Sequence, residues 1–98
     1  MTRADALSRL QQHQEHLRAL GLAHLSLFGS TARGESGPTS DLDLAVTLAD
    51  DARIDLFALA AIKTQVSDVL GTAIDMVVEP TRNPRLQAAI DRDRVHVF

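Results

Sequence analysis

The sequence contains no cysteine among its 98 residues, so disulfide bonds and thiolate zinc sites are excluded. No apolar run approaches the roughly 18 residues that a membrane-spanning helix needs, and residues 1–9 lack the apolar core of a signal peptide. The chain also has no excess of positive charge, because 10 Lys and Arg face 13 Asp and Glu for a formal net charge of −3. This balance argues against bulk attraction to nucleic acid or to an anionic membrane. We therefore expect a soluble, cytoplasmic protein that binds any phosphate group through a local site.

The chain does contain regular hydrophobic patterns. Its apolar content of 45% and its length predict one hydrophobic core, so we expect residues 1–98 to form a single domain. Gly21 and Gly71 are expected to end the first two helices, and Asp50 or Asp51 to cap the second. The predicted helices cover about residues 3–20, 53–70 and 84–91, the predicted strands cover 23–28, 41–47 and 73–78, a loop covers 35–40, and 94–98 is extended.

Two acidic residues alternate with leucines at the start of the second predicted strand. Residues two apart on a strand point to the same side, so Asp41 and Asp43 project together from Cα atoms about 6.5 to 7 Å apart. A hard divalent cation such as Mg²⁺ suits such a pair, because it takes one or two carboxylates and completes its shell with water and phosphate oxygens. Asp75 is central in the third predicted strand and would close the same site if the strands are neighbours. Three acids from two strands suit a pair of ions.

A short turn precedes these acids. Gly29 follows a predicted strand and lets the backbone approach a ligand closely, and Ser30 offers a hydroxyl and an amide to phosphate oxygens. Arg33 is one turn further on, where it could bind a phosphate or buttress an acid, and Gly34 lets the chain leave the turn. The turn and the acids together indicate a site for a nucleoside triphosphate held through metal ions.

Each of these features also has a plainer interpretation. The glycine and serine could form an ordinary turn, and Asp41 with Asp43 could be a cap and a solvated strand edge. Asp75 could be a buried acid paired with a structural arginine. Arg33 could hold a salt bridge in place of a ligand. The combination of all these residue types at this spacing favours the nucleotide site.

The segment LFGSTARGE at residues 27–35, followed by SDLDL at 40–44, resembles the signature of the minimal nucleotidyltransferases. These proteins are small relatives of DNA polymerase beta and kanamycin nucleotidyltransferase. The resemblance covers nearly the whole chain, because the family also has a leading helix, a long helix after the second strand and a third acid in a segment like IDMV at 74–77. It implies an α/β fold with a small mixed β-sheet flanked by helices, with Gly29 and Ser30 on the triphosphate and the three acids, Asp41, Asp43 and Asp75, on two Mg²⁺ ions.

The resemblance also implies a partner and a reaction. Minimal nucleotidyltransferases are commonly encoded beside a small helical HEPN-type protein, often a ribonuclease toxin. The enzyme then acts as the antitoxin and transfers a nucleoside monophosphate, typically AMP from ATP, to a hydroxyl of the toxin. Two alternatives stay open: an antitoxin that neutralises its toxin by binding alone, and a small-molecule transferase of the aminoglycoside-modifying kind.

Overall fold

The computed structural model describes residues 1–35 and 41–98, so five residues of the predicted loop at 35–40, including Ser40, lie outside the described part. No helix in that part is long and apolar enough to cross a membrane. The elements are α1 (Arg3–Gln12), α2 (Gln14–Ala19), β1 (Leu22–Phe28), α3 (Gly29–Ala32), β2 (Leu42–Leu48), α4 (Leu56–Leu70), β3 (Ile74–Val78), α5 (Pro84–Asp93) and β4 (Val95–His96).

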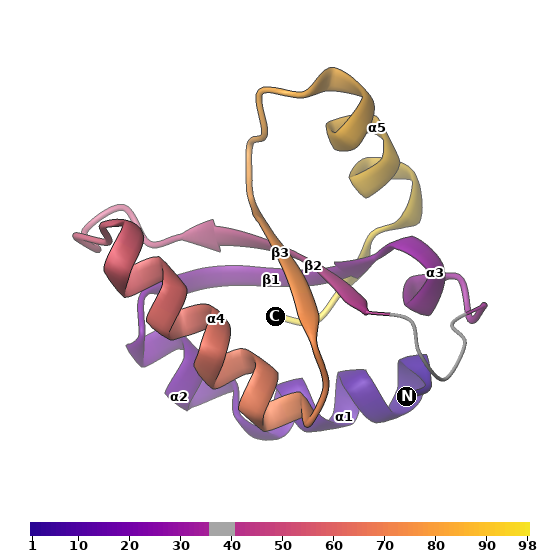
Figure 1. Cartoon of the computed structure of the whole chain (residues 1–98), viewed down its shortest axis with the longest axis horizontal. Coiled ribbons are helices and arrows are strands. Elements are labelled where there is room, and N and C mark those ends of the chain that lie inside the picture. Colours follow the sequence, from indigo (N-terminus) through magenta and orange to yellow (C-terminus); the bar gives the residue numbers. More distant parts are fainter. Residues whose placement is uncertain (36–40) are drawn as a thin grey trace.

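The strands form one mixed sheet in the order β3-β2-β1-β4. β1 runs antiparallel to both β2 and β4, whereas β2 and β3 are parallel and are joined through α4. Helices α1, α2 and α4 cover one face of the sheet, and α5 stands over the other face (Figure 1). The predicted mixed sheet flanked by helices is therefore confirmed.

Two hydrophobic clusters hold the helices to the two faces, and β2 contributes to both. Leu42, Leu44 and Val46 belong to the larger cluster, which lies between the sheet and α1, α2 and α4. Ala45 belongs to the smaller cluster, which lies under α5 and includes Phe28, Ile90, Val77 and Leu86. Because strand residues alternate between faces, the odd-numbered positions of β2, including Asp43, lie on the α5 side.

The prediction of one continuous helix over residues 3–20 is wrong, because the structure has two helices that are separated at His13. The ring Nδ1 of His13 lies 2.8 Å from the carbonyl oxygen of Arg9, and the His13 amide donates to Leu10 O at 3.2 Å. A side chain that competes for the carbonyl four residues back, together with a tighter amide bond, interrupts the regular helical ladder. The residues around the break are polar, so the spacing of the apolar residues did not predict where the helix divides.

The second predicted helix starts later than expected. Asp55 caps α4 by accepting a hydrogen bond from Ala58 N at 2.8 Å, so the expected cap at Asp50 or Asp51 is wrong. The expected end is confirmed, because Gly71 adopts a left-handed conformation with φ 70°. The last helix continues to Asp93, and the extended end of the chain contributes only two residues to the sheet as β4.

Candidate active site

The register of the two parallel strands places two of the predicted acids side by side. Asp43 of β2 pairs with Asp75 of β3, at the end of the sheet where both strands begin. Both residues lie on the face that α5 partly covers, since Ala45 and Val77, two positions further along, pack beneath that helix. Asp43 is half-buried and Asp75 is exposed. The third acid, Asp41, precedes β2 and is exposed.

Like charges crowd Asp43. Its partial burial raises the pKa of the Asp43 carboxyl above its ordinary value, the charges of Asp75 and Asp41 raise it further, and Arg33 opposes them. No three acidic or histidine side chains of residues 1–35 and 41–98 converge closely enough to bind one metal ion. The donor set nevertheless fits Mg²⁺, because this ion is commonly bound through one or two carboxylates with water and phosphate oxygens in its remaining positions.

The predicted turn lies directly against this acid pair. α3 begins immediately after β1, and Phe28 at the end of β1 pairs with Asp43 of β2. Gly29 has φ 73°, and a Cβ at this position would collide with Oδ2 of Asp43. Two independent reasons therefore disfavour a side chain at this position: the left-handed backbone conformation and the lack of space. The structure brings the turn and the acids together as one site.

The hydroxyl residues of the turn differ in their surroundings. Ser30 is half-buried, and its carbonyl oxygen accepts a hydrogen bond from Glu35 N at 2.8 Å. The neighbouring Thr31 is buried, and within the described part of the chain its Oγ1 has no hydrogen-bond partner. Thr31 was not among the predicted site residues, because a threonine in a predicted turn carries no signal of burial.

Arg33 forms salt bridges in this structure. Its Nε donates to Glu35 Oε2 at 3.0 Å and its Nη1 donates to Asp93 Oδ2 at 2.6 Å. These two carboxylates raise the pKa of the guanidinium above its already high value. Asp93, the last residue of α5, was not among the predicted site residues. The predicted helix ended at residue 91, so Asp93 stood outside it and its pattern gave no sign of a role.

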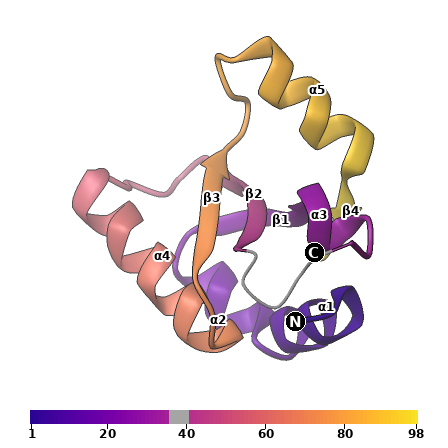
Figure 2. The same cartoon turned by 45° about the vertical axis from the view of Figure 1, so that its right-hand side comes forward.

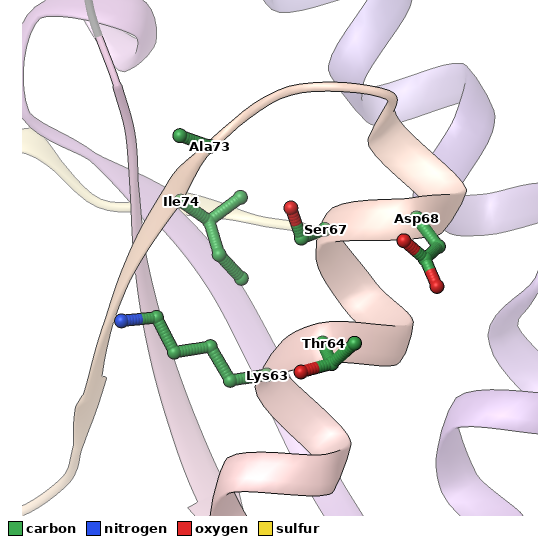
Figure 3. Close-up of a pocket in the computed structure, with 6 residues that line it drawn as sticks. All are labelled: Lys63, Thr64, Ser67, Asp68, Ala73 and Ile74. Atoms are coloured by element: carbon green, nitrogen blue, oxygen red, sulfur yellow. The ribbon is translucent and has the colours of Figure 1, made fainter.

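A separate cavity of about 310 Å³ lies between α4 and β3 (Figure 3). Ile74, which lines it, belongs to the larger hydrophobic cluster, so this cavity lies on the opposite face from Asp75. Ser67 on its wall already donates a hydrogen bond to Thr72 O at 2.6 Å. The cavity is therefore not part of the candidate site.

Comparisons with known proteins identify the domain family and other chains of the same fold. The family pattern described as a nucleotidyltransferase domain matches residues 10–95. The candidate protein adenylyltransferase MJ1217 of Methanocaldococcus jannaschii is 28% identical over 90 residues, covering 90% of each chain. A solved structure of a candidate minimal nucleotidyltransferase superposes with a TM-score of 0.79 at 29% identity, covering 97% of this chain and 95% of the other. A chain from the complex of the tri-AMPylated Shewanella oneidensis HEPN toxin with its MNT antitoxin superposes with a TM-score of 0.67 at 20% identity, covering 94% and 71%.

Proposed function

This chain belongs to the nucleotidyltransferase domain family, and we propose that it transfers the AMP moiety of ATP to a hydroxyl group of a partner protein. One observation carries the proposal: Asp43 pairs in register with Asp75, and Gly29 lies against the Asp43 carboxylate. A carboxylate pair beside a turn that exposes its backbone suits a triphosphate accompanied by divalent ions.

The proposed partner is a small helical toxin of the HEPN type, encoded nearby, which the chain neutralises as its antitoxin. One similar structure supports the HEPN toxin as partner, and one relative supports a protein as the acceptor. In the Shewanella oneidensis complex the HEPN toxin is tri-AMPylated and bound to an MNT antitoxin, and the Methanocaldococcus jannaschii relative is a candidate protein adenylyltransferase. The acceptor protein is therefore the first thing to identify for this chain.

We assign distinct roles to the residues of the site. Asp41, Asp43 and Asp75 would hold Mg²⁺, and Gly29, Ser30 and Arg33 would bind the triphosphate. Bound Mg²⁺ would neutralise phosphate charge and favour the attacking and leaving oxygens. The backbone amides and hydroxyl of the turn donate hydrogen bonds to phosphate oxygens, and the missing side chain at Gly29 lets those oxygens come close to the acids.

The transfer itself is a substitution at the α-phosphorus. The oxygen of the acceptor hydroxyl forms a bond to that phosphorus, the bond from the α-phosphorus to the bridging oxygen breaks, and pyrophosphate leaves with the electron pair. The hydroxyl proton passes to a carboxylate. We assign this proton to Asp75, because Asp75 is exposed whereas Asp43 is half-buried and lies against Gly29.

Label transfer from α-³²P-ATP tests the proposal. Wild-type chain, Asp43→Asn and Asp68→Asn are incubated with Mg²⁺ and extract of the source cells, after circular dichroism has shown that each is folded. We expect a labelled protein band with wild type and with Asp68→Asn, which removes an exposed acid on α4, and no band with Asp43→Asn. The size of the band identifies the acceptor.

The two open alternatives predict other results. If the partner is present but no band forms, and Asp43→Asn still protects cells from the partner, the chain acts by binding alone. If an aminoglycoside is labelled without any protein partner, the chain is a small-molecule transferase. Either result would overturn the proposed transfer to a protein.

A further inference from the structure

Arg33 lies between two carboxylates that differ sharply in burial. The side chain of Glu35, which bonds to Nε, is 66% exposed, whereas that of Asp93, which bonds to Nη1, is 6% exposed. An exposed ion pair contributes little net free energy and exchanges its partners readily. The bond to Asp93 is largely shielded from water, and an ion pair that is shielded in this way is screened much less than an exposed one. The two bonds of the same guanidinium therefore differ in how easily they break.

Asp93 is held in place by more than Arg33. Arg92 donates to it through Nε at 3.1 Å and through Nη2 at 3.3 Å, so both carboxylate oxygens are engaged. The hydrogen bonds from Arg92 and Arg33 lower the pKa of Asp93 below its ordinary value, so the carboxylate is ionised at neutral pH. It is a fixed negative charge at the end of α5.

Helix α5 anchors both sides of the turn that carries Gly29 and Ser30. Ahead of the turn, Phe28 packs in the smaller hydrophobic cluster with Ile90 of α5. Behind the turn, Arg33 is bonded to Asp93 of α5. Figure 2 shows α3 close to the end of α5 that leads into β4. A single helical turn cannot hold its own position, so these two contacts with α5 help to fix where the turn lies relative to Asp43, together with the bond from Arg3 Nη1 to Ala32 O at 3.1 Å.

We propose that Asp93 is a positioning residue for nucleotide binding: it holds the Arg33 guanidinium through Nη1 while Nε exchanges Glu35 for a phosphate oxygen of ATP. The guanidinium has five donors in a rigid plane, so one edge can stay bonded to a carboxylate while another meets a phosphate. This inference rests on the proposed function. It adds Asp93 as the residue that orients Arg33 and Glu35 as the residue that competes with phosphate for Arg33.

The two carboxylates consequently have opposite effects on ATP affinity. Asp93→Asn removes the charge that fixes Arg33, so we expect the Kd for ATP with Mg²⁺ to rise about tenfold. Glu35→Gln removes the competitor, so we expect the Kd to fall about twofold to threefold. Loss of a negative charge near a polyanion favours binding by itself, so weaker binding by Asp93→Asn cannot be a general charge effect. Isothermal titration of each chain with ATP and Mg²⁺ measures both constants.

Asp91→Asn is the matched control, because it removes an exposed acid of the same helix that bonds to Arg94 and Gln87 and not to Arg33. We expect its Kd to stay within about twofold of wild type. In the AMP-transfer assay the KM for ATP is expected to follow the Kd in every variant, whereas kcat is expected to change by less than about threefold. That separation distinguishes nucleotide positioning from a general loss of active protein.

Three results would overturn the inference. The first is an unchanged or lower Kd in Asp93→Asn, and the second is a higher Kd in Glu35→Gln. The third is a wild-type chain that does not bind ATP, which would also overturn the proposed function, whereas the first two leave it intact. If circular dichroism shows that Asp93→Asn is unfolded, Asp93→Glu replaces it. This variant keeps the charge but displaces it by one methylene, and we expect a Kd about threefold above wild type.

Discussion

The crowding of acids at the start of β2 and β3 predicts that Asp43→Asn makes the protein more stable when divalent ions are absent. Asp43 is half-buried beside the in-register Asp75, and partial burial and neighbouring charge both raise the pKa of its carboxyl. Asparagine has nearly the same shape and no charge. The substitution therefore removes an unfavourable interaction without creating a cavity.

The magnitude follows from the strand spacing. Neighbouring strands lie about 4.8 Å apart, and two charges about 5 Å apart repel by about 3 kcal/mol at an effective dielectric constant of 20 and by about 0.8 kcal/mol in water. Because Asp75 is exposed, solvent screening brings the value towards the lower limit. We expect Asp43→Asn to raise the free energy of unfolding by about 1 kcal/mol at pH 7.

The pH dependence has a definite sign. A carboxyl whose pKa is raised in the folded chain penalises folding while it is ionised, so wild type regains stability as the pH falls through that raised pKa. The amide of the variant does not titrate. Its advantage over wild type is therefore complete at pH 7, shrinks as the pH falls through the raised pKa of Asp43, and is lost below the ordinary aspartate pKa of about 3.9.

Urea unfolding followed by circular dichroism in EDTA measures the difference, with Asp68→Asn as a matched control on the exposed side of α4. Repeating the titration with Mg²⁺ is expected to stabilise wild type more than Asp43→Asn, because a bound ion needs the carboxylate. A variant that is less stable than wild type in EDTA at pH 7 would refute the reasoning, since it would mean that Asp43 makes a favourable contact as an anion.

The remaining predictions concern two glycines, a helix cap and an ion pair, and all are measured by urea unfolding. Gly29→Ala is expected to lose about 2 to 3 kcal/mol, because it combines a left-handed φ with a collision. Gly34→Ala, with φ 75° and no atom of residues 1–35 and 41–98 near the added methyl group, is expected to lose only about 1 kcal/mol; equal losses would show that the acid moves aside freely. Asp55→Ala is expected to cost about 1 kcal/mol and Asp51→Ala almost nothing, because the first residue caps α4; the reverse order would place the cap elsewhere. Arg94→Ala leaves the carboxylate of a largely buried glutamate without its 2.6 Å partner and is expected to cost about 1 to 2 kcal/mol; no change would show that the pair contributes nothing.

The sequence was sufficient for the parts of the site that depend on local pattern. Alternation along one strand predicted that Leu42 and Leu44 would enter a core while Asp43 faced away from it, and the structure agrees. The turn at Gly29 was likewise predicted from residues adjacent in the chain. Periodicity on each strand could not predict that Asp75 lies directly opposite Asp43, because the register depends on the path of the chain through α4.

Local sequence patterns could not predict which charged residues form salt bridges with one another. Arg33 and Asp93 are sixty residues apart in the chain, and nothing in the segment around either residue identifies the other. The cap of α4 was mispredicted for a related reason. Three aspartates precede that helix, and only the backbone conformation at Asp55 allows its side chain to reach Ala58 N.

β3 is an edge strand of the sheet, and this position affects how long Asp43 and Asp75 stay side by side. An edge strand has hydrogen bonds to the sheet along one side, so it is among the first segments to open when a protein fluctuates. Asp75 belongs to this strand, and its repulsion with Asp43 acts across the pairing that joins β3 to β2. Brief detachment of β3 would separate the two carboxylates and withdraw Ile74 from the larger hydrophobic cluster. Amide hydrogen exchange along β3 therefore reports directly how much of the time the acid pair exists.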